Sequence, residues 1–329
     1  MARPSSSPMA TRLPLLLVLL SSLALQAAAQ KYNAVYSFGD SITDTGNLTK
    51  YGLPFLPPSK STSADFKKGA NMAITGATAM DAPFFRSLGL SDKIWNNGPI
   101  SFQLQWFQTI TSSVCGSSCK SYLANSLFIF GEFGGNDYNA MLFGNYNTDQ
   151  ASTYAPQIVD TIGAGVEKLV AMGAVDVVVP GVLPIGCFPI YLTIYGTSSA
   201  ADYDSLGCLK KFNDLSTYHN SLLQAKVSAL QAKYKSARIM YADFYAGVYD
   251  MVQSPSKYGF SSVFEACCGS GGGKYNYANS ARCGMSGASA CASPASHLSW
   301  DGIHLTEAAY KQITDGWLNG AFCHPGITH

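Results

Sequence analysis

Charged residues are scarce in this sequence, and neither sign dominates. Only 12% of the 329 residues are charged, against 47% that are hydrophobic, and the formal net charge is +1. Lys and Arg form no cluster larger than doublets such as Lys67-Lys68, whereas proteins that hold a nucleic-acid backbone carry clustered basic side chains. We therefore expect no nucleic-acid partner. The length allows one large α/β domain or two small ones.

Hydrophobic runs long enough to span a bilayer are absent. The longest apolar run, Leu13–Leu20, is preceded by two arginines and followed by small residues up to Gln30. This order is typical of a secretory signal peptide, and the run is too short for a membrane span. We expect a signal peptide over residues 1–30 and a mature domain over residues 31–329, outside the cytosol and without a transmembrane segment.

Spacings typical of metal sites are also lacking. No Cys-x-x-Cys pair recurs, so we expect no metal. In an oxidising compartment the cysteines are better explained as disulfides, with at least one unpaired because their number is odd. The only glycosylation sequon begins at Asn47. The nine cysteines are Cys115, Cys119, Cys187, Cys208, Cys267, Cys268, Cys283, Cys291 and Cys323.

Short apolar runs alternate with helical patterns along the chain. Apolar residues at helical spacing predict helices over residues 156–172 and 213–234, and a third that is capped by Thr306. The stretch 267–299, rich in Gly, Ser and Cys, predicts a loop held by disulfides. The alternation implies one α/β domain with a parallel, doubly wound sheet. Five runs predict its strands, at residues 34–38, 72–75, 126–130, 175–179 and 238–241.

Reactive side chains follow the ends of predicted strands, where ligands bind in open α/β sheets. Ser41 comes directly after the first strand, behind Gly39, while Asp301 and His304 share a tight loop around Gly302. Taken singly, the serine and the aspartate can also be read as helix caps. A hydroxyl needs an adjacent base, however, and a histidine base needs a carboxylate to orient it. We therefore predict Ser41 as nucleophile, His304 as base and Asp301 as its partner.

Two further motifs offer hydrogen-bond donors. In the segment Gly134–Asp137 the glycines permit close approach of the backbone to a substrate, and the Asn136 amide can donate to an oxyanion. Gly76 offers a backbone N–H in the segment that begins at Asn71. Taken alone, the first motif is better explained as a plain turn.

Together these motifs resemble the GDSL branch of the SGNH hydrolase superfamily, in its plant secreted form, whose blocks carry Ser, Gly, Asn and His in this order. The resemblance runs from Tyr36 to Trp317, with Gly-Gly-Asn-Asp-Tyr and Trp-Asp-Gly-Ile-His-Leu-Thr as specific signatures. It implies a flavodoxin-like sheet with helices on both faces, and hydrolysis of carboxylic esters without a metal or cofactor. It also implies an oxyanion hole formed by the Ser41 amide, Gly76 and Asn136. The chain has no Gly-x-Ser-x-Gly sequence, which counts against a standard α/β-hydrolase.

The connection after the first predicted strand is unusually short. A parallel crossover usually needs a helix of about ten or more residues, yet no amphipathic period exists between Asp44 and Asn71. Plant members of the family that the chain resembles typically carry additional residues here, including a helix. We therefore hypothesise a shortened form without the first crossover helix. Apolar sheet exposed by this loss would lower stability, and a displaced Ser41 would impair the site.

These observations favour a secreted carboxylic ester hydrolase of the apoplast or cell wall that works through an acyl-enzyme. The resemblance suggests a small-molecule or polysaccharide ester as substrate, with acetyl, lipid and phenolic esters all open. Acyl transfer to another alcohol is a related alternative. A non-catalytic cell-wall or carbohydrate-binding protein is the alternative from a different class, and the gap after Leu48 is the only feature of the sequence that favours it. The 19 Tyr, 17 Phe and 4 Trp could stack on sugars, although most such rings belong to a core. The oligomeric state stays open.

Overall fold

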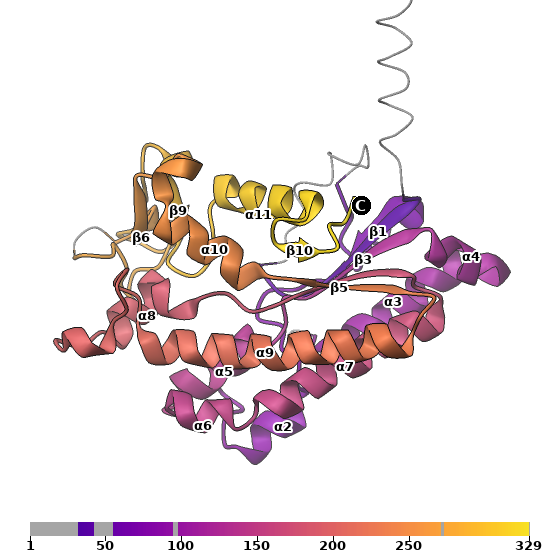
Figure 1. The fold of residues 1–329 in the computed structure, drawn as a ribbon, viewed down its shortest axis with the longest axis horizontal. Helices are drawn as coiled ribbons and strands as arrows, with labels where there is room; N and C mark the ends of the chain where they lie inside the picture. Colours follow the sequence, from indigo (N-terminus) through magenta and orange to yellow (C-terminus); the bar gives the residue numbers. More distant parts are fainter. Residues whose placement is uncertain (1–31, 43–54, 95–97, 271–272, 329) are drawn as a thin grey trace, which may run out of the picture.

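The computed structural model describes residues 32–42, 55–94, 98–270 and 273–328. The predicted signal peptide and the sequon at Asn47 lie outside these residues. A six-stranded sheet runs through the molecule between two layers of helices (Figure 1). Its strands are β1 (Ala34–Phe38), β2 (Gly69–Asn71), β3 (Ser126–Phe130), β4 (Asp176–Pro180), β5 (Arg238–Ala242) and β10 (Cys323–His324).

The strand order is β10-β5-β4-β3-β1-β2. The neighbours from β5 to β2 all pair in parallel, and only the edge strand β10 runs antiparallel to its partner β5. For the parallel strands this is the flavodoxin-like order, in which the topology changes direction between β1 and β3. The predicted single α/β domain with a doubly wound parallel sheet is thus confirmed. The two-residue edge strand was not predicted, because a run of that length has no detectable period.

Both faces of the sheet are covered, which explains why its strands are almost entirely apolar. Val177 and Val179 face one core, and Val178 between them faces the other. The helices α3 (Ile100–Val114), α7 (Ala155–Met172) and α9 (Lys210–Lys233) lie on one side of the sheet, and α10 (Phe244–Gln253) and α11 (Glu307–Asn319) lie on the opposite side (Figure 1). The larger core includes buried residues of all five helices.

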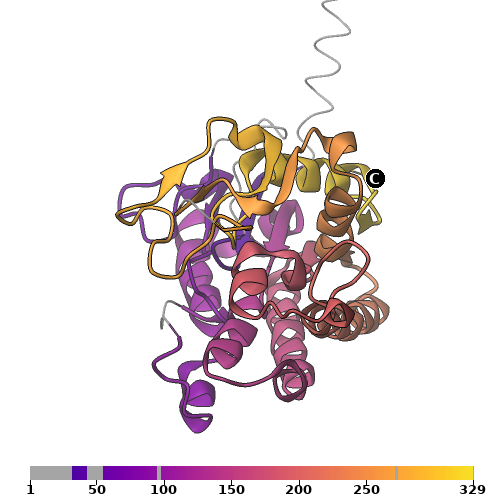
Figure 2. The same ribbon diagram turned by 90° about the vertical axis from the view of Figure 1, so that its left-hand side faces the viewer.

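Shorter elements complete the layers, and β6, β9 and α8 lie at the end of the molecule that faces the viewer in Figure 2. Two small sheets, β6–β9 and β7–β8, lie within or beside the segment that was predicted as a disulfide-held loop. The remaining helices are α2 (Ala82–Ser87), α4 (Cys119–Ala124), α5 (Gly135–Phe143), α6 (Thr148–Ser152) and α8 (Pro189–Ile194). The remaining strands are β6 (Ser262–Ala266), β7 (Cys268–Gly269), β8 (Ser289–Ala290) and β9 (His297–Ser299). The 3-10 helices are η2 (Phe66–Lys68), η3 (Gly116–Ser118), η4 (Ile185–Cys187), η5 (Ala200–Asp202), η6 (Pro255–Tyr258) and η7 (Pro294–Ser296).

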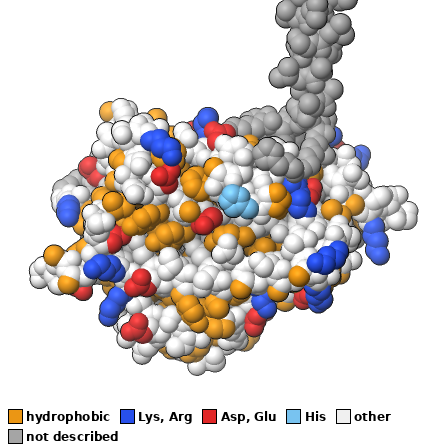
Figure 3. Space-filling view, in the orientation of Figure 1, with side chains coloured by type: hydrophobic (Ala, Val, Ile, Leu, Met, Phe, Trp, Pro, Cys, Tyr) orange, Lys and Arg blue, Asp and Glu red, His pale blue; other side chains and the backbone are white. Residues whose placement is uncertain are grey.

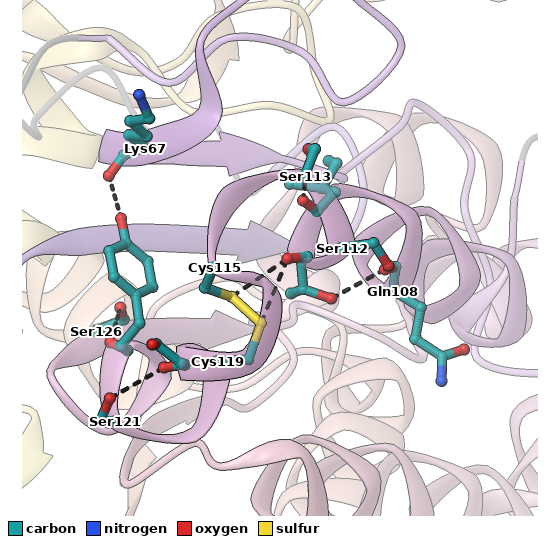
Figure 4. The surroundings of a disulfide bond; sticks show 12 residues. Lys67, Gln108, Ser112, Ser113, Cys115, Cys119, Ser121 and Ser126 are labelled. Atoms are coloured by element: carbon teal, nitrogen blue, oxygen red, sulfur yellow. Dashed lines mark hydrogen bonds between the residues drawn. A yellow bond between two sulfur atoms is a disulfide. The ribbon is translucent and has the colours of Figure 1, made fainter.

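Eight of the nine cysteines form disulfides, and the buried Cys323 is a free thiol, as the odd number required. Two bonds hold the 267–299 segment and confirm the prediction of a disulfide-held loop. Figure 4 shows another, Cys115–Cys119, which joins the end of α3 to the start of α4. The four bonds are Cys115–Cys119, Cys187–Cys208, Cys267–Cys291 and Cys268–Cys283.

The strand predicted over residues 72–75 is wrong, because β2 ends at Asn71. The Asn71 side chain accepts a hydrogen bond from the Ala73 N–H at 2.8 Å, which turns the chain out of extended geometry. The Met72 and Ile74 N–H groups still donate to β1 and to Gly39, so this segment runs beside β1 without continuing the strand. The pattern was apolar enough for a strand, but a local side-chain bond decides the conformation.

The shortened connection between β1 and β2 is described only in part. Over residues 39–42 and 55–68, the only helical turn is the three-residue η2. The rest of the connection, over residues 43–54, lies outside the described residues. Part of the region where we hypothesise the loss of a crossover helix therefore lies outside them too.

Candidate active site

The loop after β1 presents Ser41 and is held by a distant side chain. Gly39 has a φ of +136°, a conformation that favours glycine and lets the chain turn away from the strand. Gln103, a fully buried residue of α3, accepts the Gly39 N–H at 2.9 Å and donates to the Gly39 carbonyl at 2.8 Å. Both backbone groups of Gly39 are therefore satisfied by one amide, which fixes the start of the Ser41 loop.

The loop that carries Asp301 and His304 is built by its own residues. Asp301 Oδ1 accepts the N–H of Ile303 at 3.0 Å and of His304 at 2.8 Å, and Ser299 Oγ accepts the Gly302 N–H at 3.0 Å. Gly302 has a φ of +96°, so the turn depends on glycine. Thr306 then caps α11 as predicted, with its side chain accepting the Ala309 N–H.

These two loops meet at the carboxyl ends of the parallel strands. His304 Nε2 lies 2.7 Å from Ser41 Oγ, and His304 Nδ1 lies 2.7 Å from Asp301 Oδ2. Ser41 and His304, which are 263 positions apart in the sequence, therefore form one hydrogen-bonded line with Asp301, as predicted from their motifs. Ser41 is not displaced from His304, although a short connection follows it.

Electrostatics around the line suit a histidine that takes up a proton. Burial acts to raise the pKa of Asp301, but hydrogen bonds from His304 and the backbone outweigh it and hold this pKa below its ordinary value. Burial acts to lower the pKa of His304, but the hydrogen bond and charge of Asp301, with the charge of Asp40, raise it above its ordinary value. Asp301 thus favours the imidazolium form of His304.

Asn136 lies beside the nucleophile loop. Its Nδ2 donates to Asp40 Oδ2 at 2.5 Å and to the Ala77 carbonyl at 3.0 Å. Both partners are acceptors, so the amide nitrogen rather than the oxygen must face them. Gly76, the other predicted donor, has a φ of +77° in the turn directly before Ala77. The predicted oxyanion residues therefore lie in adjoining segments next to Ser41.

Four buried polar residues support this arrangement and were not predicted from the sequence. Asp40, Gln103, Glu132 and Asp137 are each at most 5% exposed. Both oxygens of Asp137 accept backbone N–H groups, one from Ala79 at 2.8 Å and one from Met80 at 2.9 Å. These bonds tie the segment after Gly76 to α5. Burial raises the pKa of Asp137 to about 7. A detectable signal was the charge of Glu132 within an otherwise apolar run, whereas Gln103 is inconspicuous in its helix.

A small cavity opens at Ser41, with a larger one nearby. The first has a volume of about 40 Å³ and the second about 880 Å³. Tyr191 lines the first and stacks at 6.4 Å on Phe143 and at 6.2 Å on Tyr195, two residues that line the second. The small cavity is lined by Asp40, Ser41, Ile42, Glu132, Gly135, Asn136, Asn139, Leu183, Ile185, Phe188, Tyr191 and Ile303.

Potential metal ligands gather at one place among the described residues, in the disulfide-held segment that precedes the Asp301 loop. Cys267, Cys291 and His297 bring sulfur and nitrogen atoms within 4.8 Å of one another. The two sulfurs are bonded to each other in a disulfide, so they are not available as thiolate ligands. On the face shown in Figure 3, Lys and Arg side chains are dispersed among hydrophobic patches.

A flavodoxin-like sheet with a hydrogen-bonded Ser–His–Asp line at its carboxyl edge is an architecture typical of hydrolases. The family model described as GDSL-like lipase/acylhydrolase matches residues 35–317. The chain belongs to this family, and it is a carboxylic ester hydrolase.

Curated relatives cover most of the chain. A GDSL esterase/lipase of Arabidopsis thaliana is 37% identical over 343 aligned positions, with 90% of this chain and 92% of the relative covered. The sinapine esterase of Brassica napus is 34% identical over 348 positions, with 92% and 90% covered. A solved structure of phospholipase A1 from Streptomyces albidoflavus is 13% identical with a TM-score of 0.32, covering 75% of this chain and 91% of that one.

Both alignments are longer than the 329 residues of this chain. These relatives therefore carry internal residues that are opposite gaps in this chain. Within the part of the chain that the structure describes, no helix combines the length and apolar character needed to cross a bilayer.

Proposed function

We propose that the protein is a secreted serine esterase that forms an acyl-enzyme on Ser41. The hydrogen-bonded line from Ser41 through His304 to Asp301, with both distances at 2.7 Å, is the observation that carries this proposal. The signal-peptide pattern of residues 1–30 and the four disulfides support secretion, because disulfides persist in oxidising compartments.

In the proposed reaction His304 removes the proton from Ser41 as its oxygen attacks the ester carbonyl. Asp301 holds the imidazole ring in the required tautomer and stabilises its cation. Asn136, the Gly76 N–H and the Ser41 N–H donate to the oxyanion of the tetrahedral intermediate. His304 then protonates the departing alcohol, and a water molecule, activated by the same histidine, hydrolyses the acyl-enzyme.

The two cavities suggest which ester is accepted. The space at Ser41, about 40 Å³, admits a short acyl group such as acetyl but not an extended fatty-acyl chain. The larger cavity beyond Tyr191 carries aromatic rings, amides and charged side chains of both signs, and its volume of about 880 Å³ suits a bulky alcohol. We therefore propose short-chain acyl esters of a large alcohol, a class that includes acetylated polysaccharides.

Labelling with a fluorophosphonate probe tests the activated nucleophile. The purified protein should bind one probe per chain, and a Ser41→Ala variant of equal thermal stability should bind none. Labelling that persists in this variant would overturn the assignment of Ser41. A folded wild-type protein that neither binds the probe nor hydrolyses any ester would instead favour the non-catalytic alternative.

A series of p-nitrophenyl esters tests the acyl specificity. We expect kcat/KM to be greatest for the acetate and to fall through the octanoate to the palmitate. An increase toward the palmitate would contradict the short acyl pocket without touching the role of Ser41. Addition of an acceptor alcohol in the same assay distinguishes hydrolysis from acyl transfer by the transesterified product.

A further inference from the structure

One face of α5 runs alongside both the small cavity at Ser41 and the large cavity beside it. Asn136 and Asn139 line the small cavity. Leu142 and Phe143, three and four positions after Asn139, line the large one. Residues at these spacings share one face of a helix. The change from the small cavity to the large one therefore falls just after Asn139.

The α8 helix repeats this arrangement. Phe188, which directly precedes α8, and Tyr191 line the small cavity. Ile194 and Tyr195, three and four positions after Tyr191, line the large one. The change between the cavities therefore falls at Tyr191 on α8, as it does at Asn139 on α5.

Tyr191 and Asn139 are joined to each other across this boundary. The Tyr191 hydroxyl donates a hydrogen bond to Asn139 Oδ1. Tyr191 is 5% exposed, so its hydroxyl lies away from bulk water and depends on this partner. The bond connects α8 to α5 and fixes the Tyr191 ring at the end of the small cavity.

The Tyr191 ring also packs against aromatic residues of the large cavity. The distances between ring centroids are 6.4 Å to Phe143, 6.2 Å to Tyr195 and 5.5 Å to Phe212. The first two rings are stacked on Tyr191, with interplanar angles of 15° and 24°. All three side chains line the large cavity. One aromatic ring thus lies between the space at Ser41 and the rings of the large cavity.

We propose that Tyr191 is a specificity-determining residue whose ring ends the acyl cavity and thereby restricts the acyl group of the substrate to a short chain. This role rests on the proposed function, because it requires the acyl group to occupy the cavity at Ser41. Without the ring, the cavity would extend to the three aromatic side chains that pack on Tyr191. A longer acyl chain would then continue along α5 and α8.

The size of the expected effect follows from the burial of methylene groups. Each methylene that moves from water into an apolar space is favoured by about fourfold, so two of them suffice for about tenfold. The quantity to measure is kcat/KM for p-nitrophenyl octanoate divided by kcat/KM for the acetate. This ratio does not depend on the fraction of active enzyme, so a partly unfolded variant does not change it.

Tyr191→Ala removes the ring, and we expect the octanoate-to-acetate ratio to rise by at least about tenfold. An unchanged or lower ratio would overturn the proposal. If this variant gives no folded protein, Tyr191→Leu decides, because it keeps an apolar side chain of intermediate size. We expect a rise of about threefold or more in Tyr191→Leu, and an unchanged ratio there would equally overturn the proposal.

Tyr191→Phe separates the ring from its hydroxyl. The variant loses the bond to Asn139 but keeps the ring and its aromatic contacts. We expect a lower thermal midpoint, because Asn139 loses its partner, and an octanoate-to-acetate ratio within about threefold of wild type, because the cavity still ends at a ring. A ratio as high as in Tyr191→Ala would overturn the proposal, since the bond rather than the ring would set the limit.

Tyr245→Ala is the matched control. Tyr245 lies on α10, stacks on Tyr249 with a centroid distance of 5.5 Å and lines neither of the two cavities. The substitution removes a stacked tyrosine ring without opening the cavity at Ser41, and we expect the wild-type ratio. A rise equal to that in Tyr191→Ala would contradict a specific role for Tyr191, because any loss of packing would then relax the acyl selectivity.

Alkyl phosphonates with a p-nitrophenyl leaving group measure the same limit on trapped enzyme. The ethyl phosphonate should label wild-type Ser41 faster than the octyl phosphonate, and Tyr191→Ala should shift this rate ratio toward octyl by at least about tenfold. In a crystal structure of labelled Tyr191→Ala, the octyl chain should pass position 191 toward Phe143 and Tyr195. A chain that leaves the small cavity by another route would overturn the proposal.

The results for Tyr191 and for Ser41 are distinguishable. If Ser41→Ala still hydrolyses the acetate, the proposed function fails. If Ser41 is required but the wild type prefers the octanoate, the short acyl cavity fails and the role of Tyr191 fails with it. If Ser41 is required and the wild type prefers the acetate, an unchanged ratio in Tyr191→Ala refutes the role of Tyr191 alone.

Discussion

The two sides of the active site are constructed differently. On the base side, Asp301, Gly302 and His304 form a closed turn whose hydrogen bonds join residues two to three positions apart. On the nucleophile side, Ser41 follows a glycine that is held by Gln103 from 64 positions away, and Asp40 bonds to Asn136, 96 positions away. The base loop is therefore held mainly by its own residues, with the Ile190 N–H donating to the Gly302 carbonyl at 3.2 Å as a distant contact, and the nucleophile loop is held mainly by distant residues.

This difference determines how each side responds to change. A local turn fails when one of its own residues is replaced, whereas a loop held from a distance fails through residues that belong to other elements. The shortened connection after β1 lies on the nucleophile side, yet Ser41 keeps its contact with His304. The long-range contacts of Gly39 and Asp40 explain how the loop stays in place.

Asp301→Asn should have the largest effect, on the base side. The asparagine can still accept the backbone N–H groups of Ile303 and His304, but it favours the wrong imidazole tautomer. We expect kcat to fall by about 10⁴-fold, as for the same exchange in serine proteases, with little loss of stability. A loss below about tenfold, measured on protein with wild-type thermal stability, would refute the role of Asp301.

Gly302→Ala should break the same turn from the backbone. The added Cβ would lie 2.5 Å from the Tyr277 ring at a φ of +96°, so the loop must shift and move His304. We expect a fall in kcat/KM of about 10²-fold. The matched control is Gly287→Ala, with a φ of +87° and no atom within 4 Å of the added Cβ, which should cost only about 1 kcal/mol of stability. Equal activity in both variants would contradict this prediction.

Gln103→Leu tests the long-range hold on the nucleophile. The substitution leaves the Gly39 N–H without its partner and removes one of the two donors to the Gly39 carbonyl, which still accepts the Ile74 N–H. We expect a loss of about 1–3 kcal/mol in the free energy of unfolding. A fall in kcat of about tenfold should accompany it, because the Ser41 loop is no longer fixed. Gln105→Leu, an exposed position on the same helix, should change neither quantity. Normal activity in a destabilised Gln103→Leu variant would show that the hold is structural only.

The pH dependence of kcat/KM gives the smallest effect, a displacement of one midpoint. His304 must be neutral to accept the Ser41 proton, and Asp301 raises its pKa above the ordinary value of about 6.5. Activity should therefore be present above the raised pKa and lost as the pH falls through it. Asp301→Asn should move the midpoint of the remaining activity to lower pH. An acidic midpoint below 6 in the wild type would be inconsistent with this pairing.

The local and long-range sides also differ in how well the sequence predicts them. The Asp301–His304 turn could be read directly, because its residues and its glycine are adjacent. Ser41 was found from its place after a strand. Gln103 was not predicted, since a buried glutamine in an amphipathic helix cannot be distinguished from an exposed one by type, and Glu132 gave only the weak signal of a charge in an apolar run.

The same reasoning applies to the fold. Strands buried on both faces, such as residues 34–38 and 126–130, were predicted with the bounds that the structure has, because every residue in them is apolar or small. The strand next to β1 was placed three residues too late, because a side-chain bond of Asn71 ends it. The pairing of the cysteines was beyond prediction, since spacing does not determine which thiols meet.

The most direct test of the proposed chemistry is to trap the acyl-enzyme. Protein mixed with p-nitrophenyl acetate and quenched in acid within the first turnovers should carry one acetyl group, located by mass spectrometry on the peptide that contains Ser41. The acetyl group should be absent in Ser41→Ala and should accumulate to a smaller extent in Asn136→Ala. Two results would contradict the assignment of Ser41 as nucleophile. One is turnover of the ester without an acetyl group on Ser41, and the other is an acetyl group on a different residue whose replacement abolishes activity.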